Sequence, residues 1–97
     1  MIRSFGDDAT QDIFDGTNSK KARKSLDSAL FPIARRKLDM IDAATNLNDI
    51  RIPPSNHFEA LKGNLKGWHS IRINDQYRIV FCWTDEGAEE VKITDYH

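Results

Sequence analysis

The sequence predicts a small α+β fold in which helices pack on one side of a β-sheet. The first half of the 97-residue chain has the three- to four-residue apolar spacing of helices, whereas the second half alternates apolar and polar residues between polar turns. A short alternating segment, Ile2 to Phe5, precedes the helices and predicts a first strand. Since no linker, repeat or low-complexity segment divides the chain, we expect residues 1–97 to form a single domain.

The helical half contains residues that typically begin and end helices. Asp7 or Asp8 can cap a short helix that runs to about Asp15, and Gly16 can end it. From residue 25 to about residue 45 the apolar residues recur at helical spacing. Pro32 interrupts this pattern, which predicts either a kink or a new helix with proline near its first turn.

One proline-containing segment and two basic clusters are also informative. Ile50 to Asn56 contains Pro53-Pro54, which predicts an extended connector without helix. Residues 35–37, Arg-Arg-Lys, predict a solvated basic face or a surface that a partner protein covers. A second basic cluster predicts either a solvated loop or helix start, or a patch that contacts phosphate. Its members are Lys20, Lys21, Arg23 and Lys24.

The strand-forming half is organised around a hairpin at residues 67–83, which reads GWHSIRINDQYRIVFCW. Its turn is Asn74-Asp75-Gln76, whose polar side chains tolerate the left-handed conformation that a tight turn needs. The run after the turn is apolar on both faces except at Arg78, so it should be a central strand. We expect another strand from about His57 to Lys62 and a last strand from about Glu89 to His97.

Composition limits the classes of function. The net charge is −1, so bulk charge gives no support to nucleic-acid binding, and any RNA contact needs a local patch or a larger assembly. Cys82 is the single cysteine, and the histidines are not at metal-ligand spacing, so we expect no metal and no other cofactor. The chain has neither an apolar run of signal length nor a membrane span, which predicts a cytoplasmic protein without a membrane partner.

Three motifs, taken in order, resemble the HigB group of host-inhibition or plasmid maintenance system killer toxins, within the RelE/ParE superfamily. They are Leu61-Lys62-Gly63, the segment SIRINDQYRIVFCW from Ser70, and the terminal Asp95-Tyr96-His97. The likeness extends over essentially the whole chain, including the MIRSF start, the RRKLDMIDAA helix and the PPSNHFEALKG connector. It implies a RelE-like domain with a curved, mostly antiparallel sheet and helices on one side.

The resemblance also implies an activity and a set of partners. Such a toxin is similar to ribosome-dependent, metal-independent endoribonucleases that enter the ribosomal A site, cleave translated mRNA and so inhibit translation. A HigA-type helix-turn-helix antitoxin neutralises it, and the pair represses its own operon, so contact with operator DNA is indirect. The near-neutral charge departs from the clearly basic character of many superfamily toxins.

RNA cleavage by attack of the ribose 2′-OH on its own phosphate needs aligned cations and groups that move protons. Arg78 is the leading candidate for stabilising charge, because a guanidinium forks onto phosphate oxygens and a strand would hold it rigidly. The structural alternative is an ion pair between Arg78 and a carboxylate such as Asp95. Arg72 alternates outward from Ile71 and Ile73, so it can line the same face.

The resemblance adds three catalytic candidates. Lys62 would supply a second cation or a proton relay, although an exposed lysine beside a turn is the alternative. Tyr96 could stack on a base or donate a hydrogen bond to phosphate. His97 suits proton transfer because the pKa of histidine lies near neutral pH. His57 and His69 are interpreted as structural or surface residues.

Two other classes of function remain open from the sequence. One is a growth inhibitor without catalysis, similar to superfamily members that poison DNA gyrase. The other is a degenerate toxin that acts only as the partner and co-repressor of its antitoxin. Retention of Lys62, Arg78, Tyr96 and His97 favours the nuclease over both.

Overall fold

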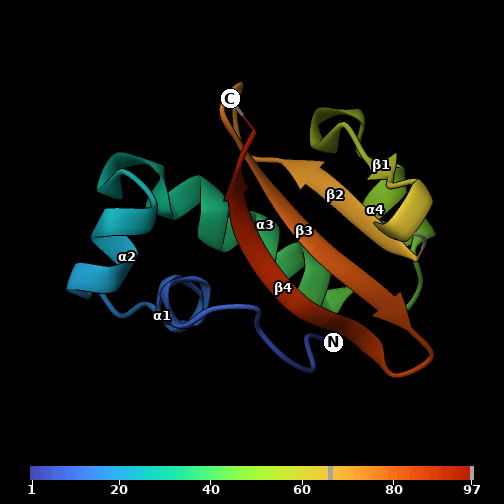
Figure 1. Cartoon of the computed structure of the whole chain (residues 1–97), viewed down its shortest axis with the longest axis horizontal. Coiled ribbons are helices and arrows are strands. Elements are labelled where there is room, and N and C mark those ends of the chain that lie inside the picture. Colours follow the sequence, from blue (N-terminus) through green and yellow to red (C-terminus); the bar gives the residue numbers. More distant parts are fainter. Residues whose placement is uncertain (66, 97) are drawn as a thin grey trace.

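The first helix begins and ends where the sequence predicts. In the computed structural model, which describes residues 1–65 and 67–96, α1 spans Asp8–Asp15 (Figure 1). The side chain of Asp7 accepts a hydrogen bond from the Thr10 amide at 2.8 Å. Gly16 ends the helix with a φ of 82°, a left-handed conformation that glycine adopts without a Cβ penalty. Both predicted helix boundaries are therefore confirmed.

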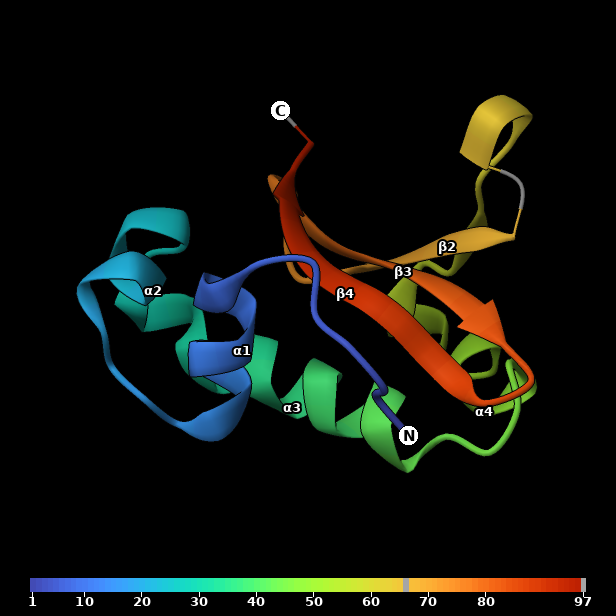
Figure 2. The same ribbon diagram turned by 60° about the horizontal axis from the view of Figure 1, so that its bottom comes forward.

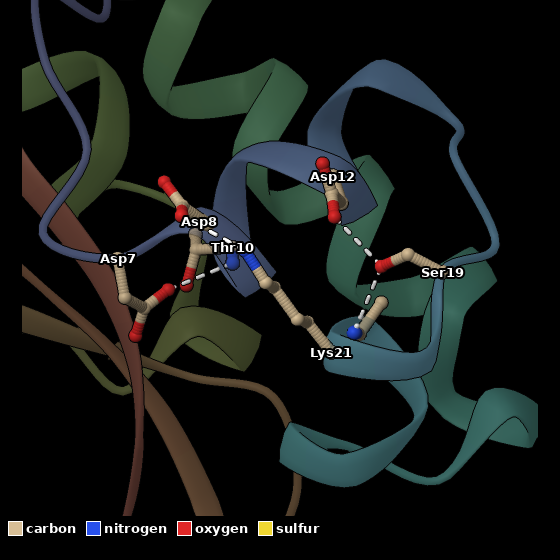
Figure 3. Close-up of polar contacts among 7 residues, drawn as sticks. Asp7, Asp8, Thr10, Asp12, Ser19 and Lys21 are labelled. Carbon is tan, nitrogen blue, oxygen red and sulfur yellow. Dashed lines mark hydrogen bonds and ion pairs between the residues drawn. The ribbon is translucent and has the colours of Figure 1, made fainter.

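Helix α2 spans Lys20–Ser25 and is tied to α1 through its own cap. Ser19 accepts a hydrogen bond from the Ala22 amide at 3.1 Å, and its hydroxyl donates to Asp12 of α1 at 2.6 Å (Figure 3). One serine thus satisfies a free amide at the start of α2 and fixes α2 against α1. The basic segment that the sequence left open between loop and helix is a short helix.

Helix α3 spans Phe31–Ala43 and lies under the sheet (Figure 2). A 3-10 turn, Ser28–Leu30, precedes it, and Pro32 occupies its first turn, where a missing N–H breaks no intrahelical hydrogen bond. Pro32 therefore marks the start of a helix rather than a kink. The buried side of α3 comprises Phe31, Ala34, Lys37, Leu38 and Ile41.

No helix in the described residues is long and apolar enough to cross a membrane.

The segment between α3 and the sheet is not the extended connector that the two prolines predicted. Helix α4 spans Asn48–Arg51, and a 3-10 turn, Pro54–Asn56, follows it. Asp49 accepts hydrogen bonds from the Thr45 amide and hydroxyl at 2.9 and 3.1 Å, which closes the chain before α4. Proline is compatible with the first turn of a helix, so the Pro-Pro pair begins a turn and does not exclude one.

The second half forms a four-stranded antiparallel sheet in the order β1-β2-β3-β4 (Figure 1). The predicted hairpin is confirmed, and β3 is a central strand, as its apolar faces predicted. The short strand β1 and the last strand β4 lie within the predicted ranges apart from the start of β4. The strands are β1 Glu59–Ala60, β2 Trp68–Arg72, β3 Tyr77–Thr84 and β4 Gly87–Asp95.

Alternation along the strands gives the sheet two different faces. Ile71 of β2, Ile79 of β3 and Ile93 of β4 are cross-strand partners and belong to the buried core that the helices cover. The opposite face, here called the open face, is not covered by α1 or α3 (Figure 2). Val80 and Arg78 of β3 lie on it. The predicted α+β arrangement, with helices on one side of an antiparallel sheet, is confirmed.

The N-terminal segment runs parallel to β4 without forming the predicted strand. Ile2 bridges Ala88 and Phe5 bridges Val91, in the same register. Between these bridges Glu90 has a φ of 53°, and its amide donates to the Ser4 hydroxyl at 2.9 Å. This irregular residue interrupts the ladder, so two isolated bridges replace a continuous strand.

Candidate functional site

Two arginines meet on the open face of the sheet. Arg72 of β2 and Arg78 of β3 are direct cross-strand partners. Because paired residues of antiparallel strands project from the same face, both guanidinium groups lie on one side, as the alternation around Arg72 predicted. Like charges at this spacing repel, so the fold must hold the pair with other contacts.

Arg78 is held by neutral oxygen atoms. Its Nε donates to the hydroxyl of Ser70 at 2.9 Å, and its Nη2 donates to the carbonyl oxygens of Ser70, at 3.3 Å, and of His57. Ser70 is fully buried, whereas Arg78 is half-buried. These acceptors fix the direction of the guanidinium without neutralising its charge, which leaves a positioned cation at the surface.

Tyr96 covers one side of this cation. The Arg78 Cζ lies 5.8 Å from the centre of the Tyr96 ring, which is within cation–π range. The Tyr96 amide donates to the carbonyl of Gln76 at 2.6 Å, so the turn before β3 anchors the residue that follows β4. Tyr96 is 46% exposed and therefore accessible to a ligand.

These side chains line a pocket of about 260 Å³, here called the arginine pocket. Its charge is mixed because two carboxylates accompany the two arginines. The exposed Asp75 forms an ion pair with Arg72, and water screens such exposed pairs strongly. A bound phosphate would therefore compete with Asp75 for Arg72. The lining residues are His57, Glu59, Arg72, Asn74, Asp75, Arg78 and Tyr96.

His57 belongs to this pocket, although the sequence interpretation assigned it to structure or surface. It has a φ of 45°, directly after the Pro54–Asn56 turn, and its side chain is exposed. It is therefore a second titratable candidate for proton transfer beside the cations. His57 lies 21 residues before Arg78, so no local sequence pattern indicates that the two residues meet. The Pro54–Asn56 turn that precedes it and the pairing of Glu59 in β1 with Ser70 in β2 bring it to the site.

An apolar pocket of about 360 Å³ adjoins the arginine pocket, because Tyr96 lines both. Its apolar walls are Leu61, Trp68 and Val80. An apolar pocket beside positioned cations suits a ligand that combines a ring with a phosphate. Its other lining residues are Gly6, Glu90, Lys92 and Thr94.

Other predicted site residues lie apart from the arginine pocket. Lys62 is exposed in the segment after β1, next to Leu61 of the apolar pocket, and lines neither pocket. Lys20, Lys21, Arg23 and Lys24 lie on α2, which packs on α1. Lys21 forms an ion pair with Asp8 at 3.2 Å (Figure 3), and Arg23 donates to Asn18. Their contact with RNA stays a prediction. His97 lies outside the described residues.

His69 has a structural role within the sheet. Its ring stacks on Phe58 with a centroid distance of 5.3 Å and lies 5.9 Å from Phe81. Its Nδ1 is buried and has no hydrogen-bond partner among the described residues. Burial lowers the pKa of His69 below its ordinary value of 6.5, and the charge of Arg51 lowers it further. The fold therefore favours the neutral ring.

This shift predicts that acid destabilises the protein through His69. The pKa of His69 is lower in the folded than in the unfolded protein. The contribution of the neutral His69 ring to the unfolding free energy is therefore fully present above pH 6.5 and is lost as pH falls through the folded-state pKa. Replacing His69 by phenylalanine should flatten the decline in unfolding free energy that sets in as pH falls below about 6.5. Urea unfolding at several pH values measures how the unfolding free energy depends on pH, with His57→Gln as the control variant. An unchanged slope in His69→Phe would contradict this assignment.

The fold matches solved structures of YoeB from Staphylococcus aureus. The YoeB–YefM complex aligns with a TM-score of 0.63 and 21% identity, covering 100% of this chain and 98% of the matched chain. The YoeB dimer aligns with a TM-score of 0.56 and 26% identity, covering 99% of this chain and 94% of the matched chain.

Among the described residues no cluster of three or more His, Cys, Asp or Glu side chains could hold a metal ion.

A family model described as "RelE-like toxin of type II toxin-antitoxin system HigB" matches residues 3–97. Fold and match together define the class, a RelE-like toxin of a type II toxin–antitoxin system. Within that class the chain belongs to the HigB-like toxin family, which confirms the resemblance found in the sequence.

Two curated proteins share sequence with part of the chain. "Toxin HigB-1" of Vibrio cholerae is 57% identical over 61 residues, which are 63% of this chain and 60% of that protein. An uncharacterized protein of Haemophilus influenzae is 46% identical over 56 residues, or 58% and 55% of the two lengths. The match thus spans less than two thirds of each relative.

Proposed function

We propose that this toxin is a ribosome-dependent, metal-independent mRNA endoribonuclease that inhibits translation. The observation that carries the proposal is the cross-strand pair of Arg72 and Arg78, which places two guanidinium groups in one pocket with Tyr96. Membership of the HigB-like family supports the toxin role. The adjoining apolar pocket suits the base of a nucleotide whose phosphate lies at the arginines.

The proposed roles of the site residues follow from where negative charge develops during RNA cleavage. Attack of the ribose 2′-OH on the adjacent phosphorus places additional negative charge on the phosphate oxygens, and the leaving 5′-oxygen needs a proton. Arg78 faces this charge with a fixed orientation, and Arg72 supplies a second cation once phosphate displaces Asp75. His97 and His57 are the candidates for moving protons. Tyr96 stacks on a base or donates to phosphate, and Lys62 is a further cation or relay.

The proposal includes the ribosome and an antitoxin as partners. The ribosomal A site would position the mRNA and supply binding that the near-neutral charge of this chain does not. A HigA-type antitoxin would neutralise the toxin and carry it to operator DNA. The YoeB–YefM complex, in which a protein of this fold is bound to a second protein, supports a protein partner for this toxin, which we propose is the antitoxin. Action on the ribosome would require a cytoplasmic location, which we propose for this protein.

Primer extension on a defined mRNA in a purified translation system tests the proposal. The wild-type toxin is compared with Arg78→Ala and with a His97 deletion, each with and without ribosomes. New 5′ ends that require both ribosomes and wild-type toxin support the nuclease. Absence of cleavage, while induction still arrests growth, would instead favour a gyrase-poison-like inhibitor. Absence of both effects, with antitoxin binding retained, would identify a co-repressor.

A further inference from the structure

A buried lysine lies under the sheet, on the opposite side from the arginine pocket. Lys37 of α3 is only 8% exposed. Burial lowers its pKa, and the charge of neighbouring Arg36 lowers it further. A buried ammonium group is costly unless it is hydrogen-bonded, so its partner is informative.

That partner is Asn56, the last residue of the Pro54–Asn56 turn. The Lys37 Nζ donates to its Oδ1 at 2.5 Å, and Asn56 is fully buried. The amide nitrogen of Asn56 donates to the Ile50 carbonyl at 2.9 Å and contacts the Met40 sulfur at 3.0 Å. Three contacts from α3 and α4 therefore fix this one side chain, and with it the turn.

The Pro54–Asn56 turn also fixes the His57 carbonyl, which is one acceptor of Arg78. His57 follows Asn56 directly, and its amide donates to the Pro54 carbonyl at 3.1 Å. With the backbone set in this way, the His57 carbonyl points to the Nη2 of Arg78 and accepts its hydrogen bond. The 3-10 turn also packs against β2, the strand that supplies Ser70 as the other acceptor of Arg78.

We propose that Lys37 and Asn56 are positioning residues for Arg78. They hold the Pro54–Asn56 turn from below the sheet, and the turn presents the His57 carbonyl that orients the guanidinium on the open face. The consequence for cleavage rests on the proposed nuclease function, whereas the consequence for the orientation of Arg78 does not. The alternative is that the buried pair stabilises the fold without affecting the site.

Nuclear magnetic resonance tests the orientation directly. The Arg78 Nε–H donates to the fully buried Ser70 and should give a slowly exchanging signal, assigned by its absence in Arg78→Lys. Lys37→Met should accelerate its exchange with solvent about tenfold, the scale of losing one hydrogen bond. Arg36→Met is the matched control, because it removes the same charge from an exposed neighbour on α3 and should leave the exchange unchanged.

The cleavage assay tests the consequence. Lys37→Met should reduce single-turnover mRNA cleavage by about 10- to 100-fold at a temperature where circular dichroism shows it folded, because misplacing a catalytic group by about 1 Å has effects of this size. Arg36→Met should cleave like wild type. If Lys37→Met does not fold, Asn56→Ser, which is a milder change, is judged by the same two readouts.

Two results would overturn the proposal. One is a folded Lys37→Met or Asn56→Ser variant with lower thermal stability but unchanged Arg78 exchange, which would make the pair purely structural. The other is equal acceleration in Arg36→Met, which would reduce the effect to loss of charge. If the wild type does not cleave mRNA, the nuclease function fails while the exchange experiment still decides the positioning role.

Discussion

Replacing Arg78 by alanine is expected to lower ribosome-dependent mRNA cleavage by at least about 100-fold, the loss typical of removing one group that stabilises transition-state charge. Arg78 combines a permanent charge with hydrogen bonds to neutral acceptors, so its orientation is fixed while its charge stays available. Arg78→Lys should recover only part of the rate, because an ammonium group lacks the planar fork. Single-turnover cleavage on programmed ribosomes measures both variants.

The same substitution should leave the protein folded. Loss of the guanidinium leaves the hydroxyl of buried Ser70 without its partner, which we expect to cost about 1–2 kcal/mol of unfolding free energy. That is a minor part of the stability of a small domain. Thermal melts recorded beside the activity assay separate the two effects. A melt showing an unfolded Arg78→Ala protein at the assay temperature would reassign Arg78 to structure, and full activity would remove it from catalysis.

Local patterns predicted much of the fold. The alternation in residues 67–83 gave the hairpin, and the apolar faces after the turn placed β3 inside the sheet. Asp7 and Gly16 marked both ends of α1, because capping depends on residues close in sequence. The same alternation placed Arg72 beside Arg78 on one face. These features share a cause, since each is decided within a few residues.

The features that the sequence missed depend on distant contacts. The Arg-Arg-Lys cluster of α3 predicted a solvated or partner-covered face, yet Lys37 is buried because Asn56, 19 residues later, accepts its hydrogen bond. His57 enters the arginine pocket through the Pro54–Asn56 turn and the pairing of β1 with β2, which both depend on contacts far along the chain. The resemblance supplied Tyr96, which the structure brings next to Arg78, and Lys62, which lies outside the arginine pocket.

Gly87→Ala is expected to be the most destabilising single-methyl change at a described glycine. Gly87 begins β4 with a φ of 129°, a conformation that residues with a side chain rarely adopt. A Cβ there would lie 2.2 Å from the Met1 carbonyl oxygen, which is backbone and cannot rotate away. That carbonyl accepts a hydrogen bond from the Ala88 amide at 2.9 Å, so relieving the clash breaks the pairing of the N-terminal segment with β4.

Strain and clash together should lower the unfolding free energy of Gly87→Ala by about 2–4 kcal/mol. For a chain of this size the melting temperature should then fall by about 10–25 °C. Gly63→Ala is the matched control, because Gly63 also has a positive φ, of 68°, but has no atom within 4 Å of the added methyl group. It should lose only the strain contribution of about 1–2 kcal/mol. If Gly87→Ala melts no lower than Gly63→Ala, the N-terminal segment can leave β4 at little cost, and its contribution to the sheet is small.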